Sequence, residues 1–133
     1  MTAGMTDENA IPEQAIGAAI EVHKHLGPGL LESAYEQCLA HEMAAQGLAF
    51  ERQKPVPLEY KGIHLDCGFR VDLLVEHCLV VEVKAVDSLT SLHEAQVLTY
   101  LRLTGCKVGL LLNFNERWLK RGIKRLVLNF GGP

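Results

Sequence analysis

The sequence predicts one α/β domain in which a central mixed β-sheet is flanked by helices. Three observations support this fold class: apolar residues recur at helical spacing in 12–46, extended β-branched-rich segments occupy 50–86, and a further helical segment precedes two more strands. The chain has 133 residues, of which 48% are hydrophobic, enough for a packed core without disulfides or metals. We therefore treat 1–133 as one domain whose polar residues 1–10 are expected to be flexible.

Two antiparallel helices are expected to open the domain. The first begins near Pro12, a residue suited to a first helical turn, and ends at the Gly-Pro-Gly segment 27–29. The second runs from about Leu30 to Gln46, where Gly47 gives the end signal.

Strands and one helix are expected to fill the rest of the chain. A hairpin turns about Glu76 and His77, and Thr90 and Ser91 are suitable helix caps. The expected elements are an edge strand or irregular entry at 50–60, hairpin strands at 63–75 and 78–86, a helix at 92–103, a strand at 108–114, a basic helical turn at 116–121 and a strand at 123–129.

Composition narrows the class of protein. The net charge of −3 excludes a polybasic protein but permits a local basic patch. The clearest apolar stretch, 108–114, is far shorter than the ~20 residues that cross a bilayer, and the acidic start does not resemble a signal peptide. We expect a cytoplasmic protein without membrane contact. The four cysteines lack zinc-site spacing and are expected to be reduced and mostly buried.

Charged residues interrupt the buried-type strands of the hairpin. Because side chains alternate along a strand, Glu82 and Lys84 share one face and Val83 lies on the other. If the hairpin turns about His77, Asp72 lies directly opposite Glu82. Carboxylates that face each other at Cβ separations of ~4.5–5.5 Å repel unless a cation lies between them.

A divalent cation would remove this repulsion. Mg²⁺ prefers oxygen ligands and keeps several waters, which suits Asp72, Glu82 and a backbone carbonyl, for which Val83 is the candidate. Lys84 could then hold the attacking water or stabilise charge on a phosphate. The alternative is an ordinary ion pair on a solvated strand face. The apolar neighbours of Glu82 favour a central strand, where charged residues call for a functional reason.

Two helical pairs indicate the same site. Gln96 and Tyr100 are four residues apart and share a helix face, from which they could hydrogen-bond phosphate or water. Glu32 and Tyr35 share a face of the second helix, so Glu32 could be a third carboxylate ligand. Taken alone, the first pair is typical of a helix surface contact, and Glu32 is typical of a first-turn acid favoured by the helix dipole.

Residues 29–35 read G-x-x-E-x-x-Y, and together with 23–28 they resemble the signature of the GxxExxY protein family, which is grouped with the PD-(D/E)XK nuclease superfamily. The resemblance covers most of the chain and implies a restriction-endonuclease-like core. Val71 stands where the naming proline would precede Asp72, a departure common among RecB-type members. The matching positions are the first-helix acid Glu32, the G-x-x-x-D acid Asp72, the E-x-K residues Glu82 and Lys84, and the Q-x-x-x-Y residues Gln96 and Tyr100.

Residues and resemblance together predict a Mg²⁺- or Mn²⁺-dependent nuclease. It would hydrolyse phosphodiester bonds in nucleic acid, with DNA favoured, by attack of a metal-bound water. The alternatives are a non-catalytic module that binds nucleic acid or protein on a nuclease fold, and a metal-dependent hydrolase of nucleotides. A homodimer is a further possibility, because a domain of this size offers little surface to surround a duplex.

A basic segment near the end of the chain could contact nucleic acid. Its cations surround Trp118 and could bind phosphates while the indole stacks on a base. The equally weighted alternative is an amphipathic turn with Trp118 packed inward. For His23 and His25, which belong to the signature segment, hydrogen bonding near the acids and a purely structural role both stay open. The cations of the basic segment are Arg117, Lys120, Arg121, Lys124 and Arg125.

Overall fold

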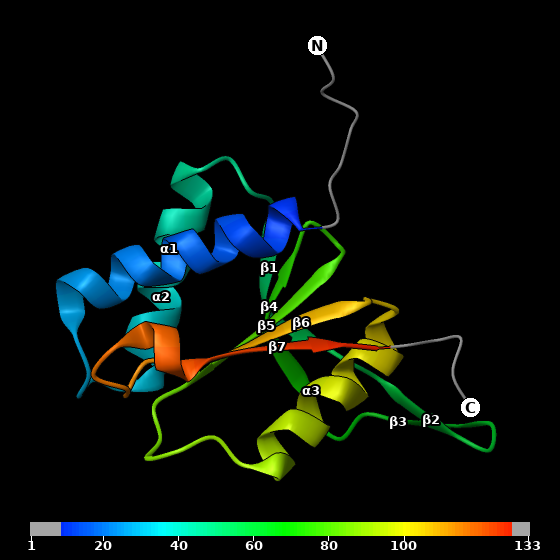
Figure 1. Ribbon diagram of the computed structural model, residues 1–133. Helices are drawn as coiled ribbons and strands as arrows, with labels where there is room; N and C mark the ends of the chain where they lie inside the picture. The colour runs from blue at the N-terminus through cyan, green and yellow to red at the C-terminus, as the bar shows by residue number, and fades with distance from the viewer. Residues whose placement is uncertain (1–8, 129–133) are drawn as a thin grey trace.

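The computed structural model describes residues 9–128 (Figure 1). Five strands form the main sheet, in the order β1-β4-β5-β6-β7, and β2 pairs with β3 in a separate two-stranded sheet. In chain order the elements are α1 (Ala10–Leu26), α2 (Glu32–Ala45), β1 (Phe50–Pro55), β2 (Leu58–Tyr60), β3 (Ile63–Leu65), β4 (Arg70–Val75), β5 (Leu79–Lys84), α3 (Ser91–Thr104), β6 (Val108–Asn113), the 3₁₀ helix η1 (Leu119–Gly122) and β7 (Ile123–Val127).

The main sheet is mixed, as the sequence predicts. β5 and β6 are parallel, whereas the other neighbouring strands are antiparallel. Parallel neighbours need a long crossover connection, and α3 provides it between β5 and β6. The α/β fold class with helices around a mixed sheet is therefore confirmed.

Helices cover both faces of the sheet, with α1 and α2 on one side and α3 on the other (Figure 1). Successive residues of β5 enter the two cores: Val81 packs under α1 and α2, and Val80 packs under α3. Gly109 of β6 allows α3 to lie close, since a Cβ atom there would be 2.6 Å from Cγ1 of Val97. The middle of β5 is thus buried from both sides.

The hairpin of β4 and β5 turns at Glu76 and His77, both of which have left-handed backbones with φ of 51° and 55°. They are the first two residues of the three-residue connection 76–78, and their left-handed backbones reverse the chain direction between β4 and β5. Leu73 pairs with Val81 and Val75 with Leu79, so the centre of the hairpin lies at His77, as expected.

Several expected elements need correction. The strand expected at 63–75 is two strands, separated near Gly68, whose φ of 76° departs from extended backbone. The basic helical turn occupies Leu119–Gly122 instead of 116–121. α1 crosses over α2 instead of running antiparallel along it (Figure 1). Of the segment expected to be flexible, Ala10 begins α1, and residues 1–8 lie outside the described residues, as does the expected strand end at 129.

Candidate functional site

The β4–β5 register brings Asp72 and Glu82 together. At this point side chains replace the usual strand-to-strand bonds: the Asp72 amide donates to Oε2 of Glu82 at 2.8 Å, and the Val83 amide donates to Oδ2 of Asp72 at 2.8 Å. The two carboxylates are thereby held next to each other where the strands part.

Both carboxyl groups are harder to ionise than usual. Burial, followed by the negative charge of Asp72, raises the pKa of Glu82 to about 8, and the side chain of Glu82 is buried in β5. Burial also raises the pKa of Asp72, against the opposing effects of the Val83 amide, the Gln53 amide and the Lys84 ammonium. An added cation would favour the ionised form of both groups, so the pair has the electrostatic character of a cation site.

Lys84 and α3 border this pair. Lys84 is half-buried at the end of β5, two residues beyond Glu82 on the same strand face, and its charge lowers the pKa of both Asp72 and Glu82. From α3, Tyr100 is buried; burial and then the charges of Glu82 and Asp72 raise its pKa, while the Gln96 side chain acts in the opposite direction. The structure therefore brings together five residues: Asp72, Glu82, Lys84, Gln96 and Tyr100.

Glu32 reaches the same end of β5 from the first position of α2. Its Oε2 accepts a hydrogen bond from the amide of Ala85, 3.1 Å away, and its charge contributes to raising the pKa of Asp72. Tyr35 fixes the start of this helix, because its hydroxyl donates to the Gly27 carbonyl at 2.5 Å and accepts from the Leu30 amide at 3.1 Å. Because Glu32 is the first residue of α2, Tyr35 holds Glu32 in place by fixing the loop before it.

The two signature histidines have structural contacts. Nε2 of the buried His23 is 2.7 Å from the carbonyl oxygen of Glu116, which joins the end of α1 to the loop after β6. Nδ1 of the exposed His25 is 3.0 Å from the Glu21 carbonyl oxygen and 3.2 Å from Glu21 Oε2. Of the two readings left open by the sequence, these contacts favour the structural one.

Four residues at the site were missed by the sequence interpretation. Glu36 lies one helical turn after Glu32, so its spacing could have indicated it. Arg52 and Gln53 of β1 both hydrogen-bond Glu36, which depends on a strand pairing that the sequence does not reveal. Buried Asn113 accepts from the amide of Val86 and donates to its carbonyl, which fixes the segment that follows Lys84.

The donor set of the pair suits a hard divalent cation, because it consists of carboxylate oxygens with raised pKa values. Within residues 9–128, no group of three or more His, Cys, Asp or Glu side chains is placed to hold a metal ion together. Asp72 and Glu82 are thus the close pair, and Glu32 stands beside it. Such a site leaves positions open to water or phosphate, the usual pattern for Mg²⁺.

The basic segment lies at the same end of the sheet as Lys84. Lys84 pairs with Asn113 at the end of β6, and β7 starts beside this end, directly after η1. Trp118 is 60% exposed with the Arg117 guanidinium 5.4 Å from its ring centre, so the inward-packing alternative is wrong. The cations Arg117, Lys120, Arg121 and Lys124 are exposed.

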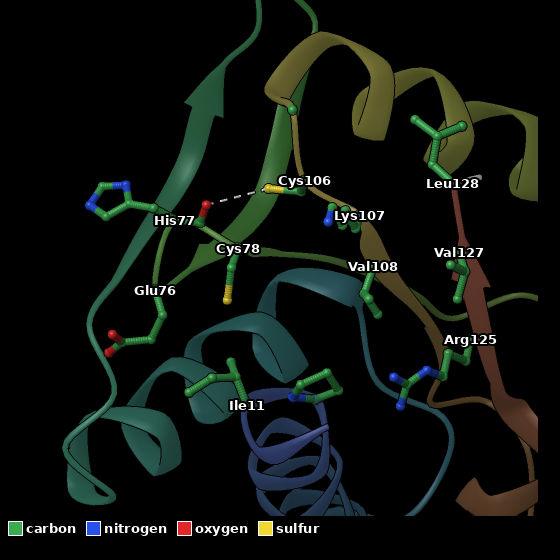
Figure 2. A pocket seen from close by; sticks show the side chains of 12 residues that line it. Ile11, Glu76, His77, Cys78, Cys106, Lys107, Val108, Arg125, Val127 and Leu128 are labelled. Carbon is green, nitrogen blue, oxygen red and sulfur yellow. Dashed lines mark hydrogen bonds between the residues drawn. The ribbon is translucent and has the colours of Figure 1, made fainter. Parts of the chain in front are cut away.

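A pocket of about 680 Å³ lies at the opposite end of β5 (Figure 2). Its lining includes one carboxylate, Glu76, whose Oε2 accepts from the Ala49 amide at 2.6 Å, so the pocket does not offer a pair of acids.

Of the two cysteines that line this pocket, Cys106 is buried and Cys78 is exposed. The expectation of mostly buried cysteines is wrong, since Cys67 is exposed as well; the cysteines are all free, as expected.

A family model described as the PD-(D/E)XK nuclease superfamily matches residues 9–126, nearly the whole described chain. The chain belongs to the PD-(D/E)XK nuclease superfamily. Its mixed sheet and three helices are consistent with the core of that superfamily, and the matched region contains every residue of the site.

Comparisons with curated proteins and with solved structures gave no match. None of the helices between residues 9 and 128 combines the length and the apolar character needed to cross a membrane.

Proposed function

We propose that this PD-(D/E)XK domain is a Mg²⁺- or Mn²⁺-dependent nuclease that hydrolyses phosphodiester bonds, with DNA as its substrate. The observation that carries the proposal is the juxtaposition of Asp72 and Glu82, two carboxylates with raised pKa values, beside the half-buried Lys84. Two neighbouring acids destabilise each other without a cation, whereas a metal-dependent hydrolase requires them. Within the superfamily, residues 29–35 support membership of the GxxExxY group.

Each residue has a part in this reaction. Asp72, Glu82 and the Val83 carbonyl would hold the metal, and Glu32, which does not form a group of three ligands with them here, would add a third negative charge beside the pair. Mg²⁺ or Mn²⁺ bound there would polarise the scissile phosphate and acidify a water molecule. Lys84 stabilises the negative charge that develops on the phosphate.

Tyr100 and Gln96 orient the phosphate or the attacking water from α3. The phenol of Tyr100 is protonated at neutral pH, as an ordinary tyrosine is, and its raised pKa favours that form further, so it acts as a hydrogen-bond donor. Arg117, Lys120, Arg121 and Lys124 bind the phosphates on either side of the scissile bond, and Trp118 stacks on a base. We place this activity in the cytoplasm, in a monomer or a homodimer.

A cleavage assay tests the proposal. Purified protein is incubated with linear, circular and single-stranded DNA and with RNA, in Mg²⁺, Mn²⁺ or EDTA. The wild type is compared with Glu82→Gln and Lys84→Met, and with Glu59→Gln, an exposed acid on β2, as the matched control.

Cleavage by the wild type and by Glu59→Gln that needs metal and is lost in both site variants supports the proposal. Equal cutting by wild type and Glu82→Gln would reject it. Absence of cutting under every condition, with nucleic acid still bound, would favour the alternative of a non-catalytic binding module.

A further inference from the structure

Gln53 has an unusual backbone for a strand residue. It lies in β1 with φ of 51°, in the left-handed region that residues other than glycine rarely adopt. Arg52 pairs with Leu73 and Lys54 with Val71, so the β1–β4 register is the same before and after Gln53. No residue is inserted, and an extended residue would serve the pairing equally well. The strain therefore needs another explanation.

The side chain of Gln53 bridges two acids. Its Nε2 donates to Oε1 of Glu36 at 2.8 Å and to Oδ1 of Asp72 at 3.1 Å. The preceding residue, Arg52, donates to Oε2 of Glu36 from Nε at 3.1 Å and from Nη2 at 3.0 Å. Consecutive residues of an extended strand point to opposite faces, yet these two reach the same carboxylate. The left-handed φ of Gln53 accounts for this.

The bridge fixes the Asp72 carboxylate at both oxygens. Oδ1 accepts from Gln53 and Oδ2 accepts from the Val83 amide, so rotation of the carboxylate would break one of two bonds. Glu36 in turn is only 7% exposed and is held by Arg52, which gives Gln53 a rigid anchor on α2.

We propose that Gln53 is a positioning residue: anchored to the Glu36–Arg52 ion pair, it orients the Asp72 carboxylate for divalent metal. This inference rests on the proposed function, since it takes Asp72 as a metal ligand. Groups that hydrogen-bond a metal ligand orient it, and their loss typically lowers metal affinity 10–100-fold. Gln53 itself does not need to touch metal or substrate.

Gln53→Gly separates positioning from stability, because glycine adopts positive φ without strain but lacks the amide. We expect the variant to stay folded, because relief of the left-handed strain offsets part of the loss of the two hydrogen bonds. By calorimetry, the Kd for Mn²⁺ should rise about tenfold or more, as should the Mn²⁺ concentration that half-activates cleavage. The kcat at saturating Mn²⁺ should stay within about twofold of the wild-type value.

His77→Gly is the matched control. It also removes a left-handed non-glycine residue, with φ of 55°, but at the turn between β4 and β5, away from the acid pair. It should leave Mn²⁺ affinity unchanged. If Gln53→Gly fails to fold, Gln53→Asn gives the same test, since asparagine tolerates positive φ but is one methylene too short to keep both bonds.

Wild-type Mn²⁺ affinity and activation in the folded Gln53 variant, while the wild type cuts DNA, would overturn this inference and leave the nuclease proposal intact. An equal loss of affinity in His77→Gly would also overturn it. If the wild type neither binds Mn²⁺ nor cuts nucleic acid, the nuclease proposal fails and this inference fails with it.

Discussion

The backbone amide of Asp72 donates a 2.8 Å hydrogen bond to Oε2 of Glu82 on the neighbouring strand. In return, the amide that follows Glu82, that of Val83, donates to Oδ2 of Asp72 at 2.8 Å. Each acid thus occupies a backbone donor of the other strand, and the two carboxylates stay adjacent although they repel. This exchange holds the acid pair in place before any cation binds.

Removal of one acid should relieve that repulsion. In metal-free protein at pH 8 we expect Glu82→Gln to increase the free energy of unfolding by about 1–3 kcal/mol, because an amide carries no charge and still accepts the Asp72 hydrogen bond. Urea unfolding in EDTA measures this. The exposed Glu59→Gln control should be unchanged, and a destabilised Glu82→Gln would contradict the electrostatic account.

The stability of the metal-free protein should fall as pH rises from about 5 to 8. Glu82 keeps its proton in the folded state, with a pKa of about 8, but loses it in the unfolded chain near its ordinary pKa of 4.5. The folded state therefore binds more protons in this window, with a slope of at most about 1.4 kcal/mol per pH unit per group. Asp72, whose pKa is also raised, acts in the same direction.

Urea unfolding at intervals from pH 5 to pH 8 in EDTA would show this slope, and Glu82→Gln should lose most of it. A wild-type protein whose stability is constant or rises over that window does not have a protonated Glu82.

Tyr35→Phe should loosen the loop that precedes α2. The hydroxyl donates to the Gly27 carbonyl and accepts from the Leu30 amide, and its loss should lower the free energy of unfolding by about 1–2 kcal/mol. Because this loop sets the start of α2, the effect should reach Glu32 and lower cleavage as well. Tyr60→Phe, at an exposed tyrosine of β2, is the control and should be neutral in both assays.

The basic segment should contribute the salt dependence of DNA binding. Changing four of its five exposed cations, Arg117, Lys120, Arg121 and Lys124, to glutamine should reduce the slope of log K against log salt by about 3–4. Fluorescence anisotropy with labelled duplex at several salt concentrations measures the slope. Lys107→Gln, an exposed cation beside the pocket at the other end of the sheet, should leave it unchanged. Equal slopes for wild type and the fourfold variant would exclude this segment from the interface.

Sequence reasoning located the acid pair because its determinants are local. The turn at Glu76 and His77 placed the centre of the hairpin at His77, and alternation along β5 then placed Glu82 and Lys84 on one face opposite Asp72. Gln96 and Tyr100 followed from helical spacing in the same way. For these residues, the periodicity of strand and helix and the position of one turn were enough to predict that they lie together.

The features that the sequence did not predict depend on contacts between segments that are far apart in the chain. Gln53 bridges acids from α2 and β4 only because β1 pairs with β4 and its own φ is positive, and neither property can be read from its neighbours in sequence. The exposure of Trp118 was also undetermined, because an amphipathic turn of four residues has too weak a pattern to show which side faces the core. The strand break near Gly68 was hidden by apolar residues on both sides.

Calorimetric titration of Mn²⁺ into wild type and Glu82→Gln at pH 7, repeated in buffers with different ionisation enthalpies, tests the central claim most directly. At this pH the Glu82 carboxyl, with its pKa of about 8, is mostly protonated, so a cation bound by Asp72 and Glu82 must displace that proton. We predict that wild type binds Mn²⁺ and releases close to one proton per metal, and that Glu82→Gln binds at least tenfold more weakly without this release. Binding of equal affinity and equal proton release in both proteins would show that the metal is held elsewhere.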